Sequence, residues 1–154
     1  MEFLRGSRDG KNAEIFHNKF DDKGKNIVLI QNDKGNIFGG YSSISWNKSG
    51  GWKNVPDCFI FSLTNIYDTE PTKFPSKKKG FEVGHYNGYG PLFGDNDDIY
   101  FFSNFQNINE QSPYSKFSIS YEDVLGKGKS IFTGDFNKNN TKMKIKEIEI
   151  FKLL

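Results

Sequence analysis

The chain has 154 residues, and its 21 basic and 19 acidic residues leave a net charge of +2 at pH 7. This length predicts one domain with a single core, and the weak charge argues against a nucleic-acid-binding protein, because the one local excess, at residues 77–79, is too short. The single cysteine excludes an intrachain disulfide, and the lack of a long apolar segment predicts a cytoplasmic protein without membrane insertion.

The first predicted element is a short helix over residues 12–20, where Ala13, Phe16 and Phe20 share one face. The segment that follows, residues 27–30, is apolar at every position. Such a run predicts a strand that is covered on both faces.

The turn at residues 32–35 leads directly into a second strand, predicted over residues 37–44, so the two strands should form a hairpin. Gly39 and Gly40 interrupt the second strand. Paired glycines inside a strand imply a bulge or the close approach of another backbone.

A loop carrying large aromatic side chains is predicted over residues 47–56. Trp46 precedes this loop and is expected to anchor the edge of the core. Trp52 lies within it and is the better candidate for a surface residue, because exposed aromatic side chains concentrate binding energy at protein interfaces.

Further strands are predicted over residues 58–63, 99–102 and 144–151, and long loops over residues 71–87 and 104–129. Because several strands are apolar on both sides, a bare sandwich would expose too much apolar surface. We therefore expect a mainly β, α+β fold in which two antiparallel sheets pack as a sandwich, with short helices and long loops covering the outer faces.

The last predicted strand contradicts simple alternation, because Glu147 and Glu149 share the parity of several apolar residues. Either a bulge resets the register, or a carboxylate faces an apolar side and needs a partner there. The only arginines in this lysine-rich chain are Arg5 and Arg8, so Arg8, or in second place Arg5, is expected to bridge to one of these glutamates. Such a pair could join the two ends of the domain or form a recognition site.

Residues with catalytic or metal-binding chemistry are sparse. His17 and His85 lie outside any nucleophile or zinc motif; His17 is expected to be packed or capping, and His85 to lie in a loop. Asp95, Asp97 and Asp98 lack the central glycine and terminal glutamate of a calcium loop. Asp98 is instead expected to bond backbone amides at the start of the next strand. No metal or cofactor is predicted.

Several short motifs occur in a characteristic order along the chain: RGSRDG at residues 5–10, GGY at 39–41, DCFIFSL at 57–63, GPLFG at 90–94 and KEIEIF at 146–151. Together they resemble the TLDc domain family. The resemblance runs from Arg5 to the C-terminus, but the helical segment that usually precedes the first motif in this family does not occur here. It implies a single TLDc-like domain over residues 1–154, truncated at its N-terminus relative to the family.

The resemblance implies a non-catalytic protein-interaction domain that is linked to oxidative-stress resistance. It further implies binding to the vacuolar proton pump, the V-ATPase, through the peripheral stalk or the soluble sector of the pump; the protein itself is expected to be a monomer. The residues best placed for partner contact are Arg8, Asp9, Trp52, Glu147 and Glu149, although Asp9 could simply cap the following helix. The motif residues with expected structural roles are Gly6, Ser7, Gly39, Gly40, Trp46, Asp57, Gly90, Pro91, Gly94 and Asp98.

Two alternatives stay open at this point. The first is a direct peroxide scavenger or another hydrolytic or redox enzyme. A peroxide scavenger would use Cys58, but a thiol in a buried strand has a raised pKa and is unreactive. A degenerate fragment without activity of its own would leave an apolar groove uncovered and would self-associate.

Overall fold

The structure, a computed structural model, describes residues 2–95, 97–101, 113–137 and 139–154. Within these residues a six-stranded sheet has the order β1 (Glu2–Arg5), β10 (Ile145–Lys152), β2 (Asn26–Asn32), β3 (Ile37–Ser42), β5 (Phe59–Thr64) and β6 (Thr72–Pro75). A four-stranded sheet has the order β4 (Trp52–Lys53), β7 (Val83–Gly84), β8 (Leu92–Phe93) and β9 (Ile99–Tyr100). The helices are α1 (Gly6–Asp9), α2 (Ala13–Phe20) and α3 (Ser130–Thr133).

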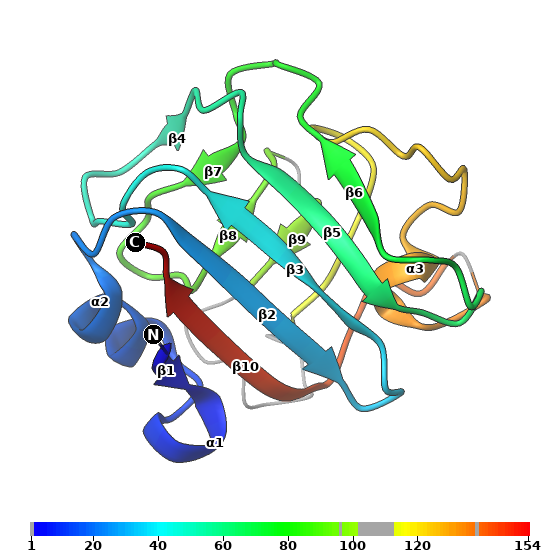
Figure 1. The fold of residues 1–154 in the computed structure, drawn as a ribbon, viewed down its shortest axis with the longest axis horizontal. Helices are drawn as coiled ribbons and strands as arrows, with labels where there is room; N and C mark the ends of the chain where they lie inside the picture. The colour runs from blue at the N-terminus through cyan, green and yellow to red at the C-terminus, as the bar shows by residue number, and fades with distance from the viewer. Residues whose placement is uncertain (1, 96, 102–112, 138) are drawn as a thin grey trace.

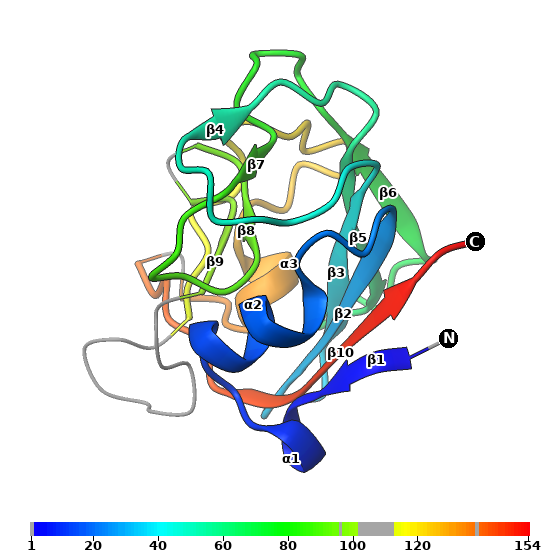
Figure 2. The ribbon, with the colours of Figure 1, turned by 90° about the vertical axis from the view of Figure 1, so that its left-hand side faces the viewer.

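The predicted fold class is confirmed, because all the strand pairs are antiparallel and the two sheets enclose one core (Figures 1 and 2). The inner face of the large sheet contributes a row of fully buried side chains, and α3 adds Phe132 beside them. The ring of Phe132 lies 4.9 Å from that of Phe117 and 5.7 Å from that of Phe74. Aromatic side chains thus fill much of the space between the layers.

The predicted N-terminal helix is confirmed as α2. Asn12 begins it, because its side-chain oxygen accepts a hydrogen bond of 2.9 Å from the Ile15 N–H. The buried face carries Ala13, Phe16 and Phe20, as the spacing predicts. Figure 2 shows α2 on the same side of the large sheet as the small sheet, so it closes one end of the core.

The predicted hairpin is also confirmed, and β2 pairs with β3 from Asn26–Ser42 to Gln31–Ile37. Its two glycines are needed for close packing. A Cβ at Gly39 would lie within 1.8 Å of the Val28 carbonyl oxygen, and one at Gly40 would lie 2.5 Å from the Phe93 ring. Gly39 therefore lets neighbouring backbones approach, and Gly40 lets the two sheets approach.

A bulge explains the mixed parity of the last strand. The pairing of β10 with β2 shifts register between Ile145 and Glu147. Ile145, Ile148 and Ile150 consequently all face the core, whereas Glu147 and Glu149 point outward. Of the two readings of this strand, the bulge is correct.

The outer face of the large sheet was expected to be covered by helices and loops, but it is only partly covered. Residues 27–30 alternate, with Val28 and Ile30 fully buried and Ile27 and Leu29 half-buried. Figure 2 shows the small sheet, α2 and α3 all on the opposite face, so none of these three covers the outer face. Helix α1 meets this face only at one end, where the Ser7 N–H bonds to Glu147. Side chains on this face instead shield one another, as where Tyr41 stacks on Phe59 at 5.0 Å.

The shortest elements are absent from the sequence predictions. Strand β4 lies in the predicted loop at residues 47–56, and β6 and β7 lie in the one at residues 71–87. Strand β9 ends at Tyr100, and the end of the strand predicted over residues 99–102 lies outside the described residues, as does part of the loop predicted over residues 104–129. Two-residue strands show no periodicity, because their pairing partners alone define them.

Candidate functional site

The charged N-terminal motif forms a closed network around Asp9. Its carboxylate accepts a forked pair of hydrogen bonds from Arg8, at 2.9 and 2.7 Å, and a third of 2.9 Å from the Arg5 backbone N–H. The Lys19 ammonium lies 2.7 Å away. The bonds from Arg8 and Lys19 hold the pKa of Asp9 well below its usual range. Asp9 therefore holds α1 in place. It does not cap the following helix, α2, because Asn12 supplies that cap.

The two outward glutamates of β10 have different partners. Arg5 lies opposite Glu149 in the β1–β10 pairing, and its Nε lies 2.9 Å from Glu149 Oε1. Glu147 Oε1 accepts hydrogen bonds from the Ser7 N–H at 2.9 Å and the Ile148 N–H at 3.0 Å. Of the two predicted arginine partners the less favoured one, Arg5, makes the bridge, because the strand register places it there.

The electrostatics of Glu147 follow from this geometry. Partial burial raises its pKa, but the hydrogen bonds from Ser7 and Ile148 outweigh burial, so the pKa lies below the ordinary value. Gly6 is needed at this corner, since a Cβ there would lie 2.8 Å from the Ile148 side chain. This glutamate thus ties α1 to the last strand.

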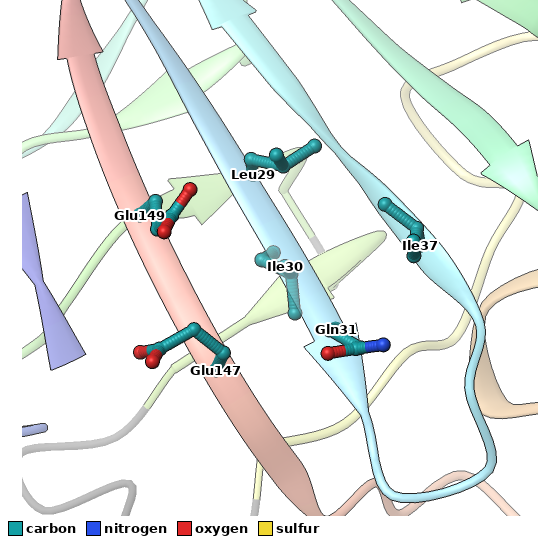
Figure 3. A pocket seen from close by; sticks show the side chains of 6 residues that line it. All are labelled: Leu29, Ile30, Gln31, Ile37, Glu147 and Glu149. Atoms are coloured by element: carbon teal, nitrogen blue, oxygen red, sulfur yellow. The ribbon is translucent and has the colours of Figure 1, made fainter. Parts of the chain in front are cut away.

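A shallow pocket of about 140 Å³ lies beside these glutamates on the outer face of the large sheet (Figure 3). Glu147 and Glu149 of β10 lie on one side and Ile37 of β3 on the other, with the side chains of β2 between them. Its carboxylates already bond Ser7 and Arg5. The pocket thus offers apolar contact beside carboxylates that are engaged within the chain.

The two tryptophans are placed as the sequence predicts. Trp46 is buried, its Nε1–H donates to Asn26 Oδ1 at 2.9 Å, and its ring lies 5.5 Å from that of Phe93. Trp52 in β4 is half-buried and rests on Gly84, where a Cβ would lie 3.0 Å from the indole ring. Trp46 therefore belongs to the core and Trp52 to the surface.

Trp52 is the first member of a row of aromatic rings that the sequence analysis missed. Successive ring centroids lie 6.0, 6.1, 5.4 and 5.0 Å apart along the series Trp52, Tyr86, Tyr89, Tyr100 and Tyr114. Beside it lies a hollow of about 340 Å³, here called the aromatic groove, lined by Trp52, Tyr86, Tyr89, Leu92, Asp95, Asp97 and Tyr100. The one local sign in the sequence is the segment YNGY at residues 86–89.

Both histidines are structural. His17 is buried, with Nδ1 2.7 Å from Asp21 Oδ1 and Nε2 3.0 and 2.9 Å from the carbonyl oxygens of Tyr86 and Tyr89. It therefore fixes the segment that carries two groove tyrosines. His85 is buried after β7, and burial, aided by the charges of Lys53 and His17, lowers its pKa to about 4. His85 is consequently neutral at pH 7.

Asp98 bonds backbone amides, but those of a distant segment and not of the next strand. Its two carboxylate oxygens accept hydrogen bonds of 2.7 Å from the N–H groups of Ile119 and Ser120. Burial raises its pKa to about 6 in spite of these bonds. Gly94 has φ +83°, and a Cβ there would lie 2.1 Å from the Asp98 carboxylate, so glycine is required.

The remaining motif residues also serve the fold. Asp57 is exposed and accepts a 2.7 Å hydrogen bond from the Ser43 hydroxyl. Gly90 and Pro91 are buried before β8, and the Gly90 N–H donates to the Phe101 carbonyl at 3.2 Å. Buried Glu82, which the sequence analysis did not single out, accepts a 2.8 Å hydrogen bond from the Val55 N–H.

Redox and metal chemistry find little support in the geometry. Cys58 is 1% exposed and precedes β5, and burial raises the pKa of its thiol. A protonated, enclosed thiol reacts slowly with peroxide. Within the described ranges no three metal-ligating side chains of the His, Cys, Asp or Glu type lie together.

The described helices are all too short or too polar to cross a lipid bilayer. A comparison with curated proteins finds no match to the chain. The sequence model of the TLDc domain family matches residues 4–154, essentially the whole chain. The order of motifs, the two-sheet fold and this match agree, and the chain belongs to the TLDc domain family, which is generally linked to resistance to oxidative stress.

Proposed function

We propose that this chain is a non-catalytic protein-interaction domain that contributes to oxidative-stress resistance by binding and regulating the V-ATPase. The observation that carries the proposal is the family match over residues 4–154. The proposal places the protein in the cytoplasm, where it would contact the peripheral stalk or the soluble sector of the pump. It acts as a monomer and needs no cofactor.

The distribution of side-chain chemistry supports an interaction role over a catalytic one. The only thiol is enclosed, and both histidines are held in the interior by hydrogen bonds. The surface, in contrast, presents half-buried aromatic rings beside Trp52. Rigid aromatic side chains supply large contact areas at a small entropic cost, which suits a binding surface.

A direct binding measurement tests the proposal. The purified chain is titrated against the isolated peripheral stalk and the isolated soluble sector of a V-ATPase, and the variants Trp52→Ala and Tyr41→Ala are measured in parallel. Trp52 lies in the small sheet, and Tyr41 lies on the outer face of the large sheet, so the pair compares two faces of the domain. We expect saturable binding that weakens about tenfold or more in Trp52→Ala and little in Tyr41→Ala.

If the folded, monomeric chain bound neither pump fragment, the V-ATPase would be excluded as its partner. Weakening by Tyr41→Ala alone would keep the interaction role and move the contact to the outer face of the large sheet. Circular dichroism and the dispersed indole signal of the buried Trp46 serve as checks that each variant is folded.

A further inference from the structure

The lining of the aromatic groove combines two kinds of group that favour a positively charged ligand. Ring faces come from Trp52, Tyr86, Tyr89 and Tyr100, and carboxylates come from Asp95 and Asp97. Aromatic faces attract ammonium and guanidinium groups, and a carboxylate beside the ring adds a charge-assisted hydrogen bond. Tyr100 stays neutral, since burial raises its pKa above the usual value.

The chain itself holds a cation at one end of this row of rings. The Lys116 ammonium lies 3.2 Å from Asp97 Oδ2 and 5.2 Å from the centre of the Tyr114 ring. The Tyr114 ring in turn stacks on that of Tyr100 at 5.0 Å. A cation bound by a carboxylate and a ring is therefore already present where the groove begins. Because the Lys116 side chain is 53% exposed, it can move away at little cost.

The groove is also held in a fixed shape. The Trp52 ring packs directly against Gly84, and the buried His17 ring makes hydrogen bonds with the carbonyl oxygens of Tyr86 and Tyr89. The Tyr114 hydroxyl donates a 2.7 Å hydrogen bond to Asp97. Groups that are ordered before binding lose less conformational entropy when a ligand arrives.

We propose that the aromatic groove binds a cationic side chain, above all an arginine, presented by a basic segment of a protein partner. The guanidinium plane matches the ring faces, and its forked donors match a carboxylate. The same carboxylates repel phosphate, which argues against nucleic acid and lipid headgroups. This inference rests on the proposed interaction role and gives a chemical identity to part of the partner surface.

A titration followed by NMR tests the groove without any pump subunit. The ¹⁵N-labelled chain is titrated with the capped peptide acetyl-Gly-Arg-Gly-amide and, as the neutral match, with the same peptide carrying citrulline. The chain has two indole N–H groups. We expect the Trp52 signal to shift saturably with a Kd on the order of 1 mM for the arginine peptide. The Trp46 signal should stay in place, since its N–H is bonded to Asn26 in the interior.

Two variants with opposite expected effects sharpen the test. Asp97→Asn preserves the left-handed backbone at φ +76° and can still accept from Tyr114, so it should weaken binding about two- to fivefold without unfolding. Lys116→Gln removes the competing ammonium and should tighten binding about two- to fivefold. Lys23→Gln, at an exposed position after α2, makes the same change in net charge and should leave the Kd unchanged.

Equal shifts with the citrulline peptide, or equal effects of Lys116→Gln and Lys23→Gln, would overturn the inference. If the chain bound the pump fragments but not the arginine peptide, the cationic ligand of the groove would be wrong, and the proposed interaction with the pump would still hold. A chain that binds the peptide but no pump fragment would support the groove and exclude the pump.

Discussion

Replacing Glu147 with alanine tests whether this glutamate or its neighbour Glu149 holds the N-terminal motif in place. Glu147 Oε1 accepts two backbone hydrogen bonds, of 2.9 and 3.0 Å, one of which crosses from β10 to α1. Glu149 makes a side-chain ion pair of 2.9 Å with Arg5. The two residues lie on the same strand and the same face, so they form a matched pair.

The expected magnitudes follow from these contacts. A hydrogen bond contributes about 0.5–1.5 kcal/mol net, so the loss of two costs about 1–3 kcal/mol, and partial solvent exposure brings this to about 1–2 kcal/mol. Glu147→Gln keeps the accepting oxygen and should lose less than half of that. The Arg5 and Glu149 side chains are 47% and 23% exposed, so Glu149→Ala should cost only about 0–1 kcal/mol.

Urea denaturation followed by tryptophan fluorescence measures the free energy of unfolding of all three variants. In thermal denaturation the loss in Glu147→Ala corresponds to a fall of about 2–8 °C in Tm. We expect Glu147→Ala to be the most destabilised of the three variants. Glu147→Gln should lose less stability, and Glu149→Ala should lose as little as Glu147→Gln or less. A larger loss in Glu149→Ala than in Glu147→Ala would refute the reasoning, because it would show that the ion pair carries the link.

Three further predictions concern residues away from this corner. Burial raises the pKa of Asp98 from 3.8 to about 6, so its contribution to stability is complete below pH 3.8 and is lost as the pH rises through 6. The free energy of unfolding of the wild type should therefore fall by about 2 kcal/mol relative to Asp98→Asn between pH 4 and pH 7, and parallel pH profiles would contradict this. Gly40→Ala would place a Cβ 2.5 Å from the Phe93 ring and should cost about 1–3 kcal/mol in urea denaturation, whereas Gly88→Ala, with no atom within 4 Å, should cost under about 1 kcal/mol. Cys58 should react with a thiol reagent at least about a hundredfold more slowly in the native than in the unfolded chain, and equal rates would show that the thiol is accessible.

The sequence predicted the elements whose periodicity is long enough to be read locally. Helix α2 and strands β2, β3, β5 and β10 all lie within a few residues of their predicted bounds. Strand β9 begins at the predicted residue, but β1, β4, β6, β7 and β8 were missed, because segments of two to four residues become strands only through partners elsewhere in the chain. The partly covered outer face of the large sheet was missed because an apolar run does not reveal which of its faces is covered.

The candidate site was less predictable than the fold for a related reason. The choice between Arg5 and Arg8 depends on the register of β1 against β10, which no local pattern specifies. Trp52 was recognisable as a candidate surface residue, but the other rings of the row come from three separate segments, which carry Tyr86 and Tyr89, Tyr100, and Tyr114. Only the packing of the small sheet brings those segments together.

The residues of the TLDc motifs and the residues of the aromatic groove have different roles. The motif residues stabilise the domain, whereas the groove residues are the ones proposed to contact a partner. Arg5 pairs with Glu149, Arg8 with Asp9, and the Ser7 N–H with Glu147, so the charged groups of the first motif are engaged inside the domain. Substitutions there should weaken partner binding only as far as they destabilise the fold. Substitutions in the aromatic groove should weaken binding by more than their cost in stability explains, because its rings are half-buried and line a hollow at the surface. Measuring binding and the free energy of unfolding on the same variants therefore distinguishes the two roles, and a motif variant that binds poorly while folding normally would show that the motif itself is part of the interface.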